Sequence, residues 1–517
     1  MFGLFRKGRV LTPHPIALGA SLYDILTALK SDVKVFPKLD VSYSAQQPLE
    51  VPVVVNLPEN GLRLRFDGPD QRLRLIEILG FDKMRFTYKN EDLIAYQDVS
   101  SPNRPNTTPL LYRRVYQLFG PSYPGEYIPP ENSSAFGTYV LSFAGVALSF
   151  PLQPSNWSPK VDHATMLSSS ASPVTSMAIY EGTSWPESRT GLFTNKPALS
   201  RSLNLPPRHK DGMPDQIEEI KILGAGRVEL LRRSSPSTFI TMSETTSQDL
   251  ITDLGPPDTV YKRPEQIDDT PRKPARPERR RSSSLVARNS YGNSYGSTPS
   301  SVSSTNTDTY DADFEEDDGI DGPDVIRSQD QYYCYFQHGF DLLLGPPAEI
   351  SEMPGQTSAK EHASDQGAST LSPHSTSAVT VTRMILHGNV PGSYSFNQHR
   401  RIRWTLDHIR KSDGGFMTSE TPFDAIHSSL LSAFKDVWPE KDMKEGMVIV
   451  RDWGGDDSPS GTAVLIGGDM DEDDEEEEES PDKDGGEQWL KNTQLYKFPG
   501  LMFEVMHNGA VSALTIY

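Results

Sequence analysis

The stretch Gly61-Leu62-Arg63-Leu64-Arg65-Phe66 decides the fold, because apolar and polar residues alternate strictly after a glycine. A period of two is typical of a half-buried β-strand. A turn at 67–70 follows, and then a second apolar strand at 73–78. Before the pair, leucine and isoleucine recur at helical spacing over 22–29, with Ser21 as the expected N-cap. This part of the chain therefore predicts one helix packed on an antiparallel meander.

The same order of helix, glycine-led strand and second strand occurs four times. The opening glycines are Gly61, Gly145, Gly339 and Gly500. The second strands carry apolar residues at relative positions 1, 4 and 6, namely Leu73/Ile76/Ile78, Val174/Met177/Ile179, Val381/Met384/Leu386 and Val511/Leu514/Ile516. The candidate helices lie around 22–29, 110–118, 250–254 and 423–431. The second and third helices end in Gly-Pro, at 120–121 and 255–256. This recurrence predicts a repeated unit, with chance alternation in a β-rich chain as the competing explanation.

The fold class that follows is α+β, with about four tandem helix-plus-meander units in two lobes. We place the lobes at 14–242 and 243–517. Three segments are too polar to join a core, and we expect 264–329, 346–377 and 467–487 to be disordered inserts. The composition agrees, because only 36% of the 517 residues are apolar while 42 are Pro and 38 are Gly.

The net charge of -20 is concentrated in a few segments. Residues 469–484 carry -11, residues 311–324 carry -8 and residues 272–288 carry +6, which leaves -7 for the remainder. This balance argues against nucleic acid as a partner. Cys334 is the only cysteine and the start of the chain lacks a signal-peptide pattern, so we expect a soluble protein of the cytoplasm.

No catalytic pattern emerges from the residues. The 11 histidines show no zinc-ligand spacing, and no phosphate-binding loop with its lysine is present. A Gly-x-Ser-x-Gly match at 292–296 falls in low-complexity sequence. His387 and His507 flank strand segments, where we expect partly exposed sheet-edge positions. We therefore predict a protein that is not an enzyme and that uses no metal or cofactor.

Two basic clusters are candidates for contact with anions. Arg400, Arg401, Arg403 and Trp404 lie on a predicted strand, and guanidinium groups beside tryptophan suit an anionic lipid interface. The competing explanation is a solvated strand whose arginines pair with nearby acids.

A second basic cluster lies in a predicted insert. Arg279 to Arg281 precede three serines, and the Arg-x-x-Ser spacing makes Ser283 and Ser284 candidate phosphorylation sites. Phosphate there would cancel a basic charge that could otherwise touch lipid.

Several stretches resemble the phagosome assembly factor family, and the chain resembles a fungal-type member with long inserts. The matching pieces include Leu39 to Ser44, Gln71 to Glu77, Phe119-Gly120-Pro121-Ser122-Tyr123-Pro124-Gly125-Glu126-Tyr127, Leu386 to Asn397 and Met502 to Gly509. They occur in family order between 18 and 517. Repeated helix-plus-meander units also look like small α+β domains that bind proteins through their sheet faces.

The resemblance implies a non-enzymatic scaffold in autophagy. Such a protein acts at the phagophore assembly site with a β-propeller partner of the breast-carcinoma-amplified-sequence type and with phosphoinositide membranes. Older naming of the family implies instead an adaptor in Golgi-to-plasma-membrane transport, and a direct phosphoinositide-binding module is a further alternative. The family supplies no catalytic residues.

Two Pro-Gly-x-Tyr loops are the expected partner contacts. They are Pro124, Gly125 and Tyr127, and Pro391, Gly392 and Tyr394. Both could instead be purely structural turns, because Pro-Gly favours a type II turn.

Overall fold

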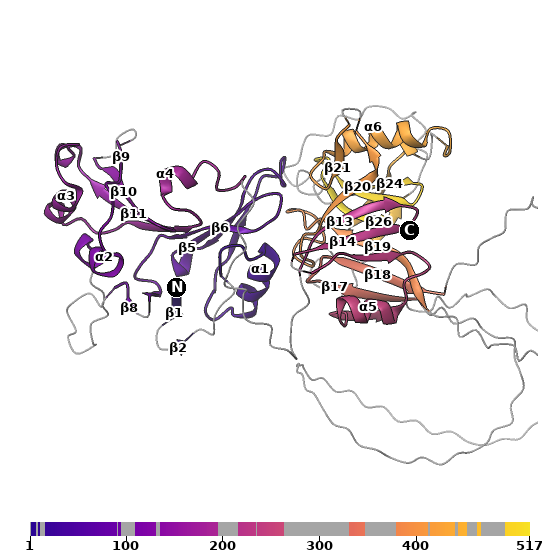
Figure 1. Ribbon diagram of the computed structural model, residues 1–517, viewed down its shortest axis with the longest axis horizontal. Helices are drawn as coiled ribbons and strands as arrows, with labels where there is room; N and C mark the ends of the chain where they lie inside the picture. The colour runs from indigo at the N-terminus through magenta and orange to yellow at the C-terminus, as the bar shows by residue number, and fades with distance from the viewer. Residues whose placement is uncertain are drawn as a thin grey trace, which may run out of the picture. The chain divides into compact units, whose positions relative to one another are not determined.

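The structure is a computed structural model of the whole chain (Figure 1). It describes residues 2–6, 9–10, 16–89, 91–94, 109–130, 135–194, 216–233, 235–262, 330–346, 379–411, 414–439, 443–451, 463–466 and 492–517. The described elements belong to one compact unit, Met1–Lys262 with Gln329–Tyr517. The predicted inserts lie outside the described residues, apart from residue 346.

An antiparallel sheet of eight strands organises the N-terminal part. Its strands, in spatial order, are β3 (Asp40–Ser42), β4 (Val53–Leu57), β5 (Leu62–Phe66), β6 (Leu73–Ile78), β12 (Ser176–Tyr180), β11 (Val146–Leu152), β10 (Gly137–Phe143) and β9 (Glu126–Ile128). The helical segments are α1 (Leu22–Ser31), η1 (Pro58–Asn60), α2 (Tyr112–Phe119), η2 (Pro154–Asn156), α3 (His163–Ser170) and α4 (Trp185–Ser188). Apolar residues of α1 and α2 share one core with the sheet.

The C-terminal part contains a similar sheet of nine strands. In spatial order they are β16 (Thr259–Lys262), β17 (Gln331–Tyr335), β18 (Phe340–Gly345), β19 (Thr380–His387), β26 (Val511–Ile516), β25 (Leu501–Met506), β24 (Thr493–Phe498), β22 (Met447–Arg451) and β23 (Ala463–Ile466). Helices α5 (Ser247–Leu254) and α6 (Phe423–Phe434) contribute to its core and lie at opposite ends of this part in Figure 1. In each large sheet two meanders meet through their last strands, β6 with β12 and β19 with β26.

Two smaller sheets complete the fold. One contains β15 (Thr238–Thr241), β14 (Arg227–Arg232), β13 (Ile217–Gly224), β20 (Arg403–Arg410) and β21 (Phe416–Thr418). The other contains β2 (Arg9–Val10), β1 (Phe2–Arg6), β7 (Arg85–Tyr88) and β8 (Glu91–Asp92).

Strands β13 and β20 are joined by a long-range pairing. They run parallel, and Ile217, Ile220 and Ile222 share a core with residues up to Ile516. A parallel pairing between distant segments leaves no local pattern in the sequence. The lobe bounds of 14–242 and 243–517 stay a prediction.

The fourfold repeat is confirmed by the strand register. The four glycines all have positive φ, between 65° and 82°, and each turns the chain into the strand that follows. The residue after each glycine pairs with the residue at relative position 6 of the next strand, as in Leu62 with Ile78 and Leu501 with Ile516. In three of the four pairings a register shift follows, at Arg65/Phe66, Leu343/Leu344 and Glu504/Val505. A β-bulge inserts one residue, which explains why the apolar positions are 1, 4 and 6 rather than 2, 4 and 6.

The helix signals are also confirmed. The Ser21 hydroxyl accepts a hydrogen bond from the backbone N–H of Asp24, as an N-cap does. Helices α2 and α5 end at Gly120 and Gly255, whose φ angles are 82° and 84°. The α+β class and the tandem units predicted from the sequence therefore describe the fold.

Candidate functional site

The first predicted contact loop leads into the outermost strand of the eight-stranded sheet. Strand β9 pairs with β10 on one side and has no strand partner on the other among the described residues. Just before it, the Tyr123 side chain is 89% exposed. Tyr127, on β9, stacks on Trp157 with ring centroids 4.8 Å apart. Ile128 and Trp157 are exposed as well. We call Tyr123, Tyr127, Ile128 and Trp157 the β9 surface.

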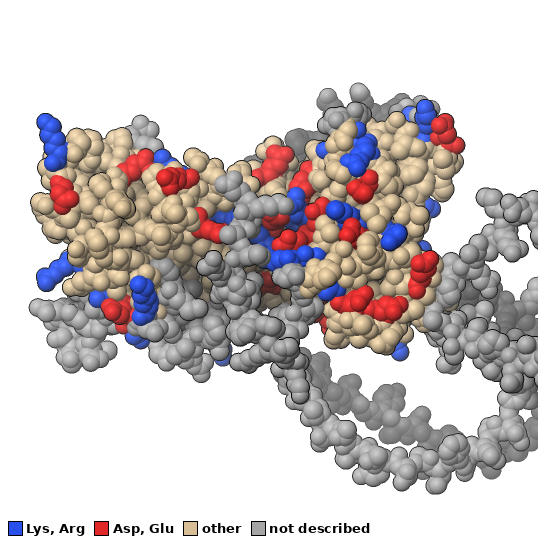
Figure 2. Space-filling view, in the orientation of Figure 1, with Lys and Arg blue, Asp and Glu red and all other residues tan. Residues whose placement is uncertain are grey.

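The backbone beneath the β9 surface is fixed in place. The N–H of Gly125 donates a 2.7 Å hydrogen bond to the Tyr139 hydroxyl, and a Cβ at Gly125 would collide with the Val140 carbonyl. Ser122 Oγ lies 3.3 Å from His163 Nε2, which ties the loop to α3. In Figure 2 the visible face around β9–β11 is mostly uncharged, with a few charged side chains. Glu126, on β9 itself, forms a 3.0 Å ion pair with Arg189. The surface therefore offers rigid aromatic groups next to one ion pair.

The second predicted contact loop has a structural position. The N–H of Ser393 bonds to the Val390 carbonyl at 3.0 Å, and Gly392 has a φ of 88°. With Pro391 at its second position, this is a type II turn. Pro391 is buried, Tyr394 is half-buried, and a Cβ at Gly392 would meet the ring of Tyr43. Only the loop at 124–127 leads to an exposed aromatic surface.

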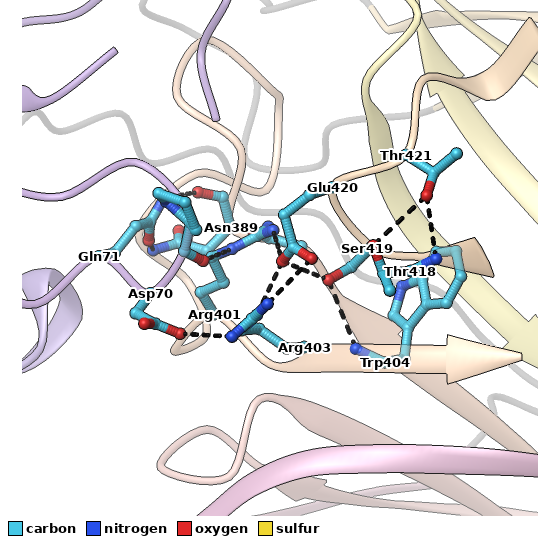
Figure 3. Close-up of polar contacts among 12 residues, drawn as sticks. Asp70, Gln71, Asn389, Arg401, Arg403, Trp404, Thr418, Ser419, Glu420 and Thr421 are labelled. Carbon is cyan, nitrogen blue, oxygen red and sulfur yellow. Dashed lines mark hydrogen bonds and ion pairs between the residues drawn. The ribbon is translucent and has the colours of Figure 1, made fainter. Parts of the chain in front are cut away.

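The basic cluster predicted to meet lipid is largely buried. Figure 3 shows the polar contacts that Arg401 and Arg403 make. Arg401 donates to the carbonyls of Pro69 and Gly388, each at 2.6 Å, and to Glu420 at 3.1 Å. Arg403 makes a fork of two hydrogen bonds to Glu420, at 2.8 and 3.2 Å, and reaches Asp70 at 3.0 Å. The arginines therefore pair with acidic groups, as the competing explanation expected. They do so in the protein interior, whereas that explanation placed them on a solvated strand.

The other two members of the cluster are also enclosed. Trp404 is 2% exposed and packs edge-on against Phe503. Arg400 is 7% exposed, and its guanidinium lies 3.5 Å from the Gln337 carbonyl. A lipid headgroup could reach these side chains only by displacing the groups that now hold them.

Glu420 is the electrostatic centre of the arginine cluster. Burial alone would raise its pKa, but the hydrogen bond from Arg403 and the charges of Arg401 and Arg403 outweigh burial and lower the pKa to about 2. Burial would likewise lower the pKa of Arg403, but the contacts with Glu420 and the charge of Asp70 raise it instead. Glu420 and Arg403 therefore remain charged at neutral pH.

A second polar cluster was not predicted from the sequence. His387 Nε2 lies 2.9 Å from Oδ2 of Asp341, and His399 Nε2 lies 2.9 Å from Oδ1 of the same carboxylate. The two imidazole rings stack with centroids 3.7 Å apart. His387 is therefore not at a sheet edge, because β19 lies between β18 and β26. His507, by contrast, is exposed. The histidines are 46 and 58 residues from Asp341, too far apart to form a local motif.

Two groups of this cluster have shifted pKa values. Burial would raise the pKa of Asp341, but the hydrogen bonds from the two histidines hold it well below its usual range. Burial lowers the pKa of His387 more than the neighbouring carboxylate raises it. Cys334, across the strands from Asp341, has its pKa raised to about 12, mainly by burial. Its thiol therefore stays protonated.

Two further points concern phosphorylation and membrane-spanning helices. The candidate phosphorylation sites Ser283 and Ser284 lie outside the described residues. Among the helices of the described ranges, none has the length and apolar character needed to cross a membrane.

Comparison with known proteins gives a consistent result. A family model described as phagosome assembly factor 1 matches residues 13–277 and 372–517. A PHAF1 protein of Drosophila melanogaster is 21% identical over 97% of this chain and 90% of its own length. A PHAF1 protein of Arabidopsis thaliana is 29% identical over 27% of this chain, and the match covers only 30% of that protein. No solved structure gives a significant match.

Proposed function

Since the chain belongs to the phagosome assembly factor 1 family, we propose that it is a non-enzymatic scaffold of autophagy that acts at the phagophore assembly site. The family name denotes an assembly factor and supports a role in autophagy-related trafficking. An assembly factor works by bringing other molecules together, so its functional site is a surface for a partner.

The observation that carries this proposal is the β9 surface. Tyrosine and tryptophan dominate the binding energy of many protein interfaces, because they bury large areas with few rotatable bonds. Tyr123 exposes most of its side chain, and the stacked pair of Tyr127 and Trp157 presents a second aromatic group. Among the described residues β9 has no strand partner on its outer side, where an additional strand can pair with the backbone.

The partner we propose is a β-propeller protein of the breast-carcinoma-amplified-sequence type, as the family resemblance implies. A rigid surface binds with a small loss of conformational entropy, which favours a stable complex. The hydrogen bond between Gly125 and Tyr139 supports this expectation, because it holds the loop in one conformation.

We propose that the chain associates with membranes through its partner rather than by binding lipid itself. Arg401 and Trp404 are buried, and Arg403 is engaged with Glu420 and Asp70. In vesicle flotation, the purified chain alone is therefore expected not to float with phosphoinositide-containing vesicles, whereas the complex does. Flotation of the chain alone would favour a direct phosphoinositide-binding module.

The test of the scaffold is a pull-down with the double variant Tyr123→Ser/Trp157→Ser. If the β9 surface binds the propeller protein, the variant should recover at least about 10-fold less of it, because two exposed anchor residues are lost. The matched control is Tyr261→Ser, which changes a 56% exposed tyrosine on β16, the outermost strand of the other large sheet.

The outcomes separate the candidate functions. Equal recovery by the double variant and Tyr261→Ser would exclude the β9 surface as the contact. Recovery of no stable partner by the unmodified chain would remove the scaffold proposal itself. If the unmodified chain gathered at the Golgi rather than at phagophores, an adaptor role in Golgi-to-plasma-membrane transport would replace it.

A further inference from the structure

Three side chains that converge from separate segments suggest a site unrelated to the β9 surface. We propose that Asp341, His387 and His399 bind a divalent transition-metal cation, with Zn²⁺ as the best match. Asp341 comes from β18, His387 from the end of β19, and His399 from the segment between β19 and β20. One potential ligand atom of each lies within 4.8 Å of the others.

The chemistry of the three ligands matches zinc. Imidazole nitrogen and carboxylate oxygen are regular zinc ligands, and two histidines with one acid are a known set for a site that keeps an open position. Such a set is too rich in nitrogen for Ca²⁺ or Mg²⁺, which prefer oxygen ligands. Zn–N and Zn–O distances are roughly 2.0–2.2 Å, so the three side chains must draw together and the stacked rings must tilt.

The local charge also favours a cation. Asp341 is mostly buried, and among the described residues no lysine or arginine forms an ion pair with it. Two of its hydrogen-bond partners are imidazoles whose side chains are at most 12% exposed, and another is the neutral thiol of Cys334. A buried carboxylate with no fixed positive partner is costly. A divalent ion would supply that charge directly.

The remaining imidazole nitrogens set the expected strength of binding. For Nε2 to bind the ion, its proton must move to Nδ1, so that each ring stays neutral and no proton is released. The Nδ1 atoms of His387 and His399 are both buried and have no hydrogen-bond partner among the described residues. Histidine ligands normally donate that N–H to a second group, whose loss costs about 10- to 100-fold in affinity. We therefore expect a site weaker than a permanent structural zinc site, and one that responds to metal supply.

Metal binding would also stabilise a particular part of the chain. His399 follows Asn389 in the same segment and lies two residues before Arg401. Asn389 bonds to Gln71, and Arg401 bonds to the Pro69 carbonyl. Fixing His399 to β18 and β19 would restrain this segment at one end. Zinc is therefore expected to raise the unfolding temperature.

The experiment is titration of the purified, metal-free full-length chain with Co²⁺, a spectroscopic substitute for Zn²⁺. We expect one equivalent to bind, with the visible absorption of a four-coordinate site, and Zn²⁺ to displace it. The acidic run at 471–479 also attracts cations, but only through oxygen, so it does not give this absorption. Absence of the absorption, or no displacement by Zn²⁺, would overturn the proposal.

Variants locate the site. His399→Asn should lower metal affinity by more than about 100-fold, because even loss of an outer partner costs about 10- to 100-fold. His507→Asn, an exposed histidine outside the cluster, should bind as the unmodified chain does. Circular dichroism of both variants without metal shows whether they fold. If His399→Asn misfolds, the site can be tested in the unmodified chain by NMR. Zinc should then shift the signals of two histidines together. Equal binding by folded His399→Asn, or unshifted signals, would contradict the site.

Discussion

Gln71 and Asn389 exchange two hydrogen bonds of 2.8 Å across 318 residues of sequence. The Gln71 amide donates to the backbone carbonyl of Asn389, and the Asn389 amide donates to the side-chain oxygen of Gln71 (Figure 3). Both residues are 1% exposed. Beside them, Arg401 and Arg403 reach Pro69 and Asp70. The turn before β6 and the segment before β20 are thereby joined by a buried polar network.

Removing one side of the amide pair should be costly. In Gln71→Ala the Asn389 amide loses its partner while it stays buried, so we expect a loss of about 1–3 kcal/mol in the free energy of unfolding. Gln398→Ala, at an exposed position, serves as control and should change it by less than about 0.5 kcal/mol. Urea denaturation measures both values. An equal effect of the two substitutions would show that the pair contributes nothing.

Substitution of Arg401 in the arginine cluster should lower the free energy of unfolding more than substitution of Gln71. Arg401→Ala removes three hydrogen bonds and leaves Glu420 short of a counter-charge, for an expected loss of about 3–5 kcal/mol. Arg401→Lys should recover only part of this loss, because an ammonium group cannot reproduce the guanidinium fork. Arg113→Ala, at an exposed position of α2, is the control. Full recovery by lysine would mean that charge alone matters.

Glu420 predicts how stability changes with pH. A carboxyl group whose pKa is lowered by folding stabilises the folded protein above its unfolded pKa, and this contribution is lost as pH falls toward about 2. Glu420→Gln should therefore be less stable than the unmodified chain at pH 7, by about 3 kcal/mol. The difference should shrink between pH 5 and the lowest pH at which both chains fold. A difference that stayed constant over this range would contradict the assigned pKa.

Gly339 of the repeat can be compared with Gly509, a glycine outside the four repeat positions. Gly339 and Gly509 both have positive φ, 82° and 76°, and a Cβ would add strain of about 1–2 kcal/mol at either. At Gly339 the Cβ would also lie 2.3 Å from the Arg400 carbonyl, whereas at Gly509 it meets nothing within 4 Å. Gly339→Ala should thus lower the unfolding temperature clearly more than Gly509→Ala. Equal decreases in the unfolding temperature would mean that the positive φ alone, and not the contact with Arg400, destabilises the variants.

The repeat could be predicted from the sequence because it depends on local features. Alternation after a glycine is visible within the first strand of each pair, and apolar positions 1, 4 and 6 are visible within the second strand. The cause of the odd 1-4-6 spacing, a β-bulge, became evident only from the pairing. Helix ends at Gly120 and Gly255 were predictable for the same local reason.

The candidate sites depend on distant partners and were predicted less well. Arg401 and Arg403 read as surface groups because Asp70 and Glu420, which neutralise them, lie elsewhere in the sequence. Asp341 and the two histidines show no ligand spacing for the same reason. Tyr123 stands in the family-like stretch, yet its exposure could not be known without the position of β9 at the sheet edge.

If the β9 surface recruits the chain to sites of phagophore assembly, its loss should change where the chain gathers in cells. The direct measurement is imaging of fluorescently labelled chains in starved cells that lack the endogenous protein. We predict that the unmodified chain and Tyr261→Ser form puncta that coincide with a phagophore marker, whereas Tyr123→Ser/Trp157→Ser stays diffuse at equal abundance. Puncta of equal number and position for the double variant would contradict the account.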